Sequence, residues 1–196
     1  MATLSWYIAR STGIAAWMLL TASVLLGLSM SSKISFGNRT DGTLRRARPA
    51  WQLDLHQYVS ALASIFTGVH ILAILTDSQS HFTLWSALVP FASTWKPGPT
   101  AWGVTALYVL IAVEVSSLAK KHLPKKAWRA IHFASFPLFL MATIHGVTSG
   151  TDAHTWLAVI ATAAAVAAVA GMTAFRIAAT AERNASSAPR VPVGVR

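Results

Sequence analysis

The sequence predicts an all-α integral membrane protein, a helical bundle with five membrane-spanning helices. Of its 196 residues, 54% are hydrophobic and only 11% are charged, whereas a soluble domain carries about 25% charged residues. The mean hydropathy is +0.52, and five stretches approach the roughly 20 apolar residues that a spanning helix needs. This composition excludes a soluble globular domain, and it excludes a disordered chain because disorder requires low hydrophobicity.

Breaks rich in Pro, Gly or charge separate the five predicted spans. The first span is longer than the roughly 7–15 apolar residues of a signal peptide, and more positive residues follow it than precede it, so it is predicted to be an uncleaved anchor. The fifth span is rich in Ala and contains Gly171, which favours a packing face. The predicted spans are residues 13–30 (starting as early as Trp6), 56–76, 102–118, 128–147 and 155–177.

The segment between the second and third spans, residues 81–99, is too short to cross the bilayer and is interrupted by Pro90, Pro97 and Pro99. Its aromatic residues suit the headgroup level of a membrane, where such rings gather. The segment is therefore predicted to be either an interfacial helix or an ordinary aromatic-rich loop. The aromatic residues in question are Phe82, Trp85, Phe91 and Trp95.

The net charge of +10 is explained by topology. Fourteen of the sixteen Lys and Arg residues fall in the loop after the first span, the loop after the third span and the C-terminal segment, which share one side of a five-span topology. Only Arg10 and Lys96 fall on the other side. The positive-inside rule then predicts an N-terminus outside and a cytoplasmic C-terminus. The expected partner is the lipid bilayer, and no nucleic acid is needed to explain the charge.

Two regions are expected along the chain. Residues 1–177 form the transmembrane domain, and the more polar residues 178–196, with Pro189 and Pro192, form a disordered cytoplasmic tail. This tail is too short to hold a flavin or nicotinamide domain, and the chain has no Gly-rich dinucleotide motif. Cysteine is absent, which excludes thiolate metal ligands and a covalently attached c-type haem.

Four of the seven histidines lie inside predicted spans, where ionisable side chains are rare and mark function by default. His56 and His70 are 14 residues apart on the second span, and His132 and His145 are 13 apart on the fourth. At a rise of about 1.5 Å per residue, each separation is about 20 Å along the helix. Because the two spans run in the same direction, His56 lies at the depth of His132, and His70 at the depth of His145.

Each depth therefore offers two imidazoles from different helices, which is typical of haem sites in helical bundles. The separation along each helix excludes a zinc or copper ion bound by three or four of these residues. A hydrogen bond to a neighbouring helix would explain a single such histidine equally well. On an ideal helix the pair on the second span points within about 40° of one direction, but the pair on the fourth diverges by about 140°. We therefore predict a kink or bulge near Pro137, between the two.

The histidine-bearing stretches resemble the ferric reductase-like transmembrane family. This family includes the membrane parts of ferric reductases and NADPH oxidases, and the haem-binding membrane subunit of a bacterial methionine-sulfoxide reductase system. The resemblance covers about residues 6–177, although many relatives have six spans and the oxidase-type relatives carry a flavin domain. The matching stretches are LHQYVSALASIFTGVH (55–70), WRAIHFASFPLFLMATIHG (128–146) and, as in bacterial members, ARSTG (9–13) and HGVTSGTD (145–152).

The resemblance implies a b-type di-haem electron-transfer protein of the bacterial plasma membrane, acting as the membrane component of an oxidoreductase. His56 and His132 would be the iron ligands of a cytoplasmic-side haem b, and His70 and His145 those of an exterior-side haem b. The electron donor would be a separate flavoprotein or a quinol, and the acceptor a ferric chelate or a partner reductase outside. No residue is assigned a catalytic role, because both axial positions of each iron are filled.

Three charged residues are further candidates. Arg129, one turn before His132, is expected to bind a haem carboxylate, since guanidinium matches carboxylate geometry. Arg10 is expected either to make a similar contact or to anchor its helix at the interface. Glu114 is expected to snorkel or to pair with a nearby Lys, with proton transfer or contact with a quinol as the alternative.

The remaining histidines, His81, His122 and His154, are expected to be solvated, with binding of an external metal by His81 or His154 as the alternative. A second function remains open beside electron transfer. In that reading the chain is a haem-free structural or transport protein whose histidines serve helix packing or proton movement.

Overall fold

The computed structural model describes residues 4–31, 50–78 and 82–186, with side chains described as far as Ala181. In these ranges every regular element is helical, and five helical segments are long and apolar enough to cross a membrane. The predicted fold class is therefore confirmed, and the chain is a multi-pass, all-α membrane protein.

The elements follow the predicted order. Four of the spans are single helices, whereas the fourth is divided into two. A short helix precedes the third span and a 3-10 turn follows it. The bounds are α1 Leu4–Ser31, α2 Ala50–Leu75, α3 Leu84–Leu88, α4 Pro97–Leu118, η1 Lys120–His122, α5 Lys125–Phe133, α6 Ser135–Ser149 and α7 Trp156–Ser186.

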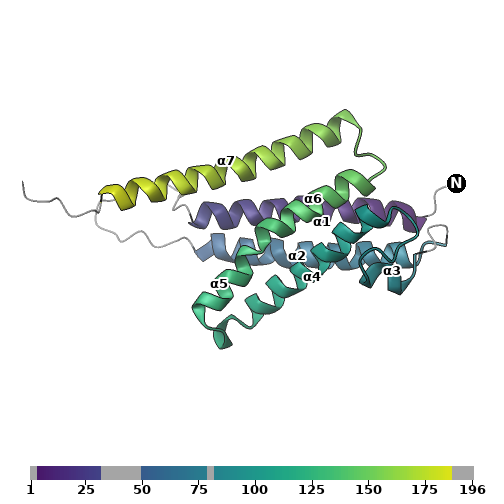
Figure 1. Ribbon diagram of the computed structural model, residues 1–196, viewed down its shortest axis with the longest axis horizontal. Helices are drawn as coiled ribbons and strands as arrows, with labels where there is room; N and C mark the ends of the chain where they lie inside the picture. Colours follow the sequence, from purple (N-terminus) through teal and green to yellow (C-terminus); the bar gives the residue numbers. More distant parts are fainter. Residues whose placement is uncertain (1–3, 32–49, 79–81, 187–196) are drawn as a thin grey trace, which may run out of the picture.

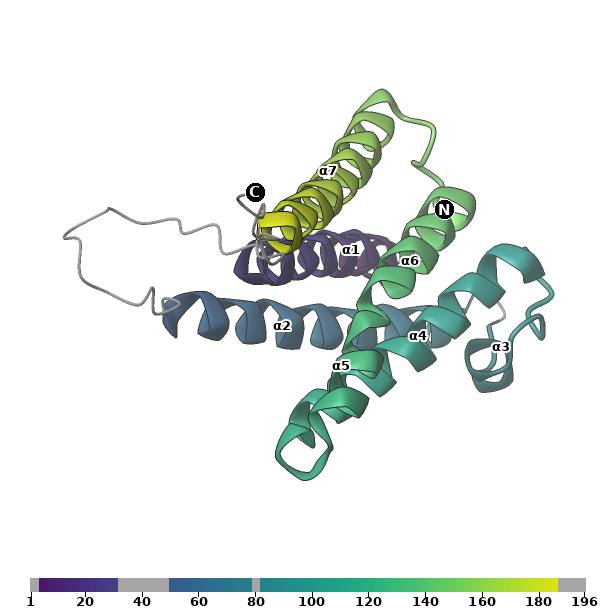
Figure 2. The same ribbon diagram turned by 60° about the vertical axis from the view of Figure 1, so that its left-hand side comes forward.

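The helices form an elongated bundle in which α1 is the central element (Figures 1 and 2). α1 packs along α2 and also contacts α6 and α7, while α4 packs along α6. A small apolar core forms where α1, α6 and α7 meet, from Val24, Leu28, Phe139 and Val169. α7 is the least enclosed span and lies along the outside of the bundle.

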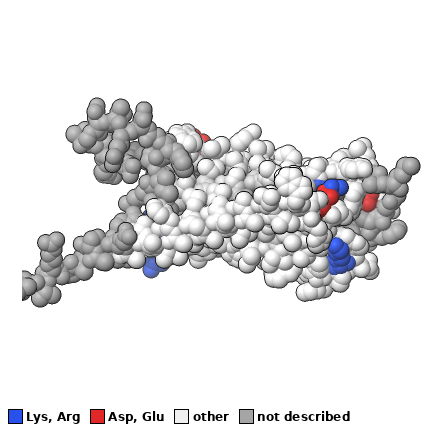
Figure 3. Space-filling view, turned by 90° about the horizontal axis from the view of Figure 1, so that it is seen from above, with Lys and Arg blue, Asp and Glu red and all other residues white. Residues whose placement is uncertain are grey.

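The outer surface of the bundle is apolar. Large side chains such as Leu72, Leu157 and Ile160 are more than half exposed on the spans. In the face drawn in Figure 3, charged side chains lie toward the ends of the molecule and the middle is free of them. A surface of this kind is stable in the hydrocarbon of a bilayer, since it leaves no charge to be desolvated there. The predicted contact with lipid follows.

The fourth span breaks between the two histidines that it carries. α5 ends at Phe133, α6 begins at Ser135, and the intervening Ala134 has φ −64° and ψ −8°. The amide of Ala134 donates to the carbonyl of Ile131 over a 3-10-type turn, at 2.9 Å. Pro137 has no amide hydrogen to donate to the Phe133 carbonyl four residues earlier, which explains why the helix breaks here. The irregularity predicted near Pro137 is thus confirmed.

The segment between the second and third spans contains the short helix α3. Its N-cap is Thr83, whose hydroxyl accepts from the Ser86 amide at 3.2 Å. The Tyr108 hydroxyl donates to the Leu88 carbonyl at 2.6 Å and thereby fastens α3 to α4. Trp85 and Phe91 are exposed. A helix is therefore present where one was predicted, and its position at the membrane interface stays a prediction.

The last helix does not end at Ile177 as predicted. α7 continues to Ser186, so the predicted start of a disordered tail at residue 178 is wrong. Residues 178–186 contain several Ala, a Glu and an Arg, which are strong helix formers, and neither Gly nor Pro interrupts them. The prediction of disorder for residues 187–196 concerns residues outside those that the structure describes.

Candidate functional site

The structure brings the four span histidines together in two pairs. His56 of α2 and His132 of α5 have ring centres 6.1 Å apart, with ring planes at 75°. His70 of α2 and His145 of α6 have ring centres 6.4 Å apart, with planes at 80°. We call His56 and His132 the first pair, and His70 and His145 the second pair. These are the pairings that the sequence predicts, one at each depth.

The two pairs lie far apart along the bundle. Their α2 members are separated by 14 residues, which is about 21 Å at 1.5 Å per residue. On the other side, the regular helix of the fourth span changes at Ala134 to a 3-10-type turn between His132 and His145. That change allows both of these rings to face α2, although an uninterrupted helix would point them about 140° apart.

The Nδ1 atoms of three histidines lie against backbone carbonyls of neighbouring helices. His70 Nδ1 lies 2.6 Å from the Ala9 carbonyl oxygen, His145 Nδ1 lies 2.9 Å from that of Pro99, and His56 Nδ1 lies 3.0 Å from that of Ser23. A carbonyl can only accept, so each Nδ1 is the protonated donor nitrogen. In a neutral imidazole the lone pair then resides on Nε2, which is the usual arrangement of a metal-binding histidine.

Hydroxyl groups supplement these contacts around the first pair. The Ser23 hydroxyl lies 3.2 Å from His56 Nδ1 and 2.7 Å from the Ser60 hydroxyl. His132 has a longer contact, 3.4 Å from its Nδ1 to the Ser117 hydroxyl. The first pair is therefore oriented partly by side chains.

Glycines allow the flanking helices to approach the second pair closely. A Cβ atom on Gly13 would lie 2.8 Å from the His70 ring, and one on Gly103 would lie 2.7 Å from the His145 ring. Both distances are too short for a real Cβ contact, so these positions admit only Gly without a shift of the ring. At the first pair, a Cβ on Gly27 would lie 3.6 Å from His56, an ordinary contact.

Sequence reasoning missed these supporting residues, although their spacing carried a signal. Gly13 and Gly27 on α1 are 14 residues apart, as are His70 and His56 on the antiparallel α2. Gly103 and Ser117 on α4 repeat this spacing opposite His145 and His132. Small residues at the same spacing on the flanking helices could have been found in the sequence alone.

The first pair has an additional aromatic neighbour. The Trp128 indole stacks on the His132 ring at 5.0 Å between ring centres and 23° between planes. The Lys120 ammonium lies 4.2 Å from the centre of the Trp128 ring. The Trp128 Nε1 atom is buried and has no hydrogen-bond partner among the described residues. A buried donor without a partner is rare and indicates that a further group belongs there.

The two arginines proposed from sequence differ in their surroundings. Arg129 is exposed on α5, and the described part of the chain offers it no ion pair. Arg10 forms an ion pair with Asp152, which joins α1 to the loop after α6. The sequence did not suggest this partner, although both residues lie in the stretches that resemble bacterial family members. Arg10 therefore has a structural role in the bundle.

Glu114 lies on α4 and borders a cavity of about 210 Å³ between α2 and α4. No Lys or Arg forms an ion pair with it within the described ranges, so the expected pairing with a Lys is absent there. Ser64 and Thr67 line the same cavity from α2, and Gly68 beside them faces open space. Of the loop histidines, His122 and His154 are exposed, as predicted, and His81 lies outside the described residues.

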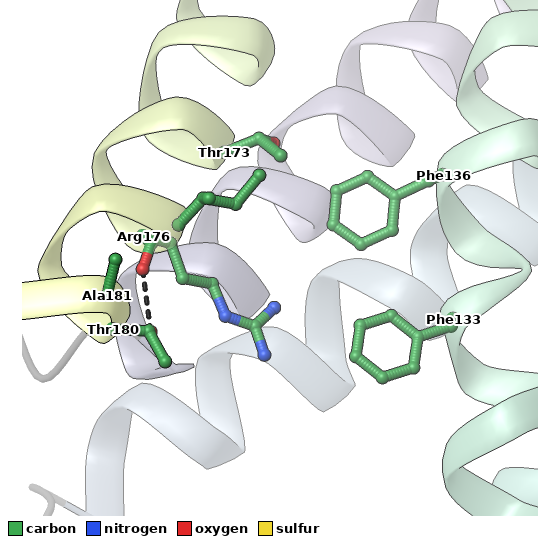
Figure 4. Close-up of a pocket in the computed structure, with 7 residues that line it drawn as sticks. Phe133, Phe136, Thr173, Arg176, Thr180 and Ala181 are labelled. Carbon is green, nitrogen blue, oxygen red and sulfur yellow. Dashed lines mark hydrogen bonds between the residues drawn. The ribbon is translucent and has the colours of Figure 1, made fainter. Parts of the chain in front are cut away.

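A larger cavity, of about 510 Å³, lies between α7 and the α5–α6 span (Figure 4). Arg176 extends from α7 toward Phe133 and Phe136, with its guanidinium carbon 5.5 Å from the Phe133 ring centre. The Thr180 hydroxyl donates to the Arg176 carbonyl at 2.7 Å. No histidine lines this cavity, which is therefore separate from both pairs.

The donor set and spacing of each pair fit a bis-histidine haem iron. Within the described residues, no three His, Cys, Asp or Glu side chains lie close enough to hold one ion, so each pair supplies two ligands. A bond of about 2.0–2.1 Å from each nitrogen to the metal, plus about 1.1 Å from nitrogen to ring centre, puts opposed ring centres about 6.2–6.4 Å apart. The separations of the two pairs, 6.1 and 6.4 Å, lie close to that range.

Comparisons with known proteins add no family assignment. No protein-family model, no curated protein and no solved structure matches the chain. The functional interpretation therefore rests on the histidine pairs and the groups around them.

Proposed function

We propose that the chain is a transmembrane di-haem electron-transfer protein, the membrane component of an oxidoreductase. The observation that carries this proposal is the presence of two histidine pairs between α2 and the fourth span. In each pair the ring centres are separated by a distance that suits one metal ion bound between them. The resemblance of the histidine-bearing stretches to the ferric reductase-like transmembrane family supports it. Haem b supplies the one-electron redox change when it is bound.

The protein residues have three tasks in this function. His56, His132, His70 and His145 provide the axial nitrogens. The carbonyls of Ser23, Ala9 and Pro99 hold three of these rings in the tautomer that leaves Nε2 free. The apolar spans exclude water and bring the two sites to different depths, so that an electron crosses in shorter steps than the full bilayer thickness of about 30 Å.

The proposed direction of transfer follows from the distribution of charge. The end of the bundle near the first pair carries Lys120, Lys121, Lys125, Lys126 and Arg129. By the positive-inside rule this end is cytoplasmic, in a bacterial plasma membrane, and the N-terminus is outside. Electrons then enter at the first pair from a flavoprotein or a quinol and leave at the second pair to a ferric chelate or a partner reductase.

Haem stoichiometry tests the proposal most directly. The purified protein from haem-replete cells is expected to show b-type bands in reduced-minus-oxidised spectra and two haems per chain by pyridine hemochrome. A folded, colourless protein would instead favour the haem-free structural or transport function.

Single histidine variants test the pairing. H56A or H132A is expected to remove one haem, and H70A or H145A the other, because each iron loses one of its two axial ligands. H122A and H154A are matched controls, since these exposed histidines lie outside both pairs, and they are expected to retain two haems. Redox titration identifies which haem is lost. Equal partial loss from all four span variants would contradict the assignment of two sites.

A further inference from the structure

The unexplained group nearest the first pair is the Trp128 indole N–H. Its Nε1 atom is excluded from solvent and has no partner among the described residues. Leaving such a donor unpaired costs about 1–3 kcal/mol, and more where the missing partner is charged. Because Trp128 stacks on His132, the missing acceptor belongs beside the first pair.

The electrostatic surroundings indicate the charge of that acceptor. The Lys120 ammonium lies over the Trp128 ring at 4.2 Å from its centre. An in-plane donor N–H with a cation over the same ring favours an anion nearby, and most of all a carboxylate, which accepts hydrogen bonds strongly when it is ionised. The six acidic residues of the chain supply no ion pair to Lys120 within the described ranges. A carboxylate from a bound group would supply this acceptor.

We propose that the Trp128 indole N–H, with Lys120 beside it, binds a carboxylate of the haem held by the first pair. This inference rests on the proposed function, because b-type haem is the bound group that brings carboxylates to this position. It differs from the sequence-based prediction, which gives that role to Arg129, an exposed side chain on α5, and that prediction stays open. Trp128 is a positioning residue that acts on the haem through its carboxylate.

The stack suggests how the sequence builds this site. Trp128 and His132 are four residues apart on α5, so their side chains lie on one face of the helix, one turn apart. The 3-10 turn η1 places the Lys120 ammonium over the indole ring. Three residues of one loop and helix thereby combine a metal ligand, a hydrogen-bond donor and a cation.

The experiment uses W128F, which keeps an aromatic ring on His132 and removes only the N–H. W51F is the matched control, because Trp51 is half exposed and lies at the end of α2 that carries His56 of the first pair. R129Q tests the sequence-based prediction that Arg129 binds the carboxylate. The readouts are the midpoint potential of each haem and the propionate bending band in resonance Raman spectra, with the haem of the second pair as the internal reference.

In W128F, we expect the first-pair haem to shift about threefold to tenfold toward the ferric form at a fixed potential, because a carboxylate without its donor keeps more negative charge near the iron. The propionate band changes with it, while the second-pair haem, W51F and R129Q stay as in the wild type. Should W128F fail to retain its first haem, K120M provides the same readouts with the indole intact, and a smaller shift of the same sign is expected.

Unchanged propionate bands in both W128F and K120M, or a shift in R129Q instead, would overturn the assignment of the carboxylate site. Either result leaves two haems per chain, so the proposed function would stand. A wild-type protein without haem would fail earlier, at the stoichiometry measurement, and would remove both proposals together.

Discussion

The two histidine pairs share one spacing but are held in place differently. Around the second pair, both Nδ1 atoms contact backbone carbonyls at 2.6 and 2.9 Å, and two glycines bring the flanking helices against the rings. Around the first pair, the closest carbonyl contact is 3.0 Å, and His132 relies on the Ser117 hydroxyl and on Trp128. Backbone carbonyls and close helix approach therefore dominate at the second pair, where the Ser149 hydroxyl lies 3.4 Å from His145 Nδ1, while side chains have a larger share at the first pair.

This difference has consequences for how each site responds to change. A ring held by backbone atoms of packed helices moves only if the helices move, so the second site is expected to be rigid and intolerant of added volume. A ring held by hydroxyl, indole and ammonium groups can be adjusted by single substitutions. We therefore expect single substitutions to alter the first site more readily than the second.

The largest expected effect comes from adding one methyl group beside the second pair. G13A and G103A place a Cβ within 2.8 and 2.7 Å of the His70 and His145 rings. Overpacking of this kind costs about 1–3 kcal/mol, so the haem affinity of the second site is expected to fall by about 5-fold to 150-fold. Haem content by pyridine hemochrome is the measurement, with a decrease from two haems toward one.

G27A is the matched control for the glycine variants. Its new Cβ lies 3.6 Å from the His56 ring, an ordinary van der Waals distance, and both haems are expected to remain. If G27A lost as much haem as G103A, close helix approach would not distinguish the two sites.

A smaller effect is expected from straightening the fourth span. P137A supplies an amide hydrogen that can bond the Phe133 carbonyl, which favours a continuous helix through Ala134. His132 would then turn away from His56, while α6 stays packed on α4. We expect haem binding at the first site to weaken by roughly 1 kcal/mol, or about fivefold, since one recovered backbone hydrogen bond is of this size.

Haem titration of the apoprotein measures this change, and P90A, which alters a proline outside the spans, serves as its control. A P137A protein that loses the second haem in preference to the first would contradict the role assigned to the break.

The smallest effect is expected at the ion pair between Arg10 and Asp152. The two side chains are 39% and 34% exposed, and partly exposed ion pairs contribute about 0.2–1 kcal/mol. A double-mutant cycle of R10Q and D152N in thermal unfolding is expected to give a coupling energy in this range. Both haems are expected to remain, because the second pair next to Arg10 is held by carbonyls and glycines. Loss of the second haem in R10Q would show that the ion pair, too, holds this site.

Much of the fold could be predicted from sequence because a bilayer imposes a simple rule. Segments without charge that are long enough to span must become helices, since lipid offers no partner for backbone polar groups. The five spans, and the irregularity at Pro137, follow from this rule and from the missing proline amide. The continuation of α7 to Ser186 was missed, because the polar residues at its end were interpreted as a tail although their helix propensity is high.

The candidate site, too, has features that the sequence determines and features that only the tertiary structure determines. The sequence by itself determined that four histidines lie at two depths, because rise per residue converts spacing into distance. Only the tertiary structure decided which carbonyls orient the rings, which glycines make room for them, and that Trp128 rather than Arg129 is the enclosed donor at the first pair. These contacts depend on how neighbouring helices rotate and approach one another. Packing between segments that are distant in the chain sets that geometry, and the spacing of residues along a single helix does not encode it.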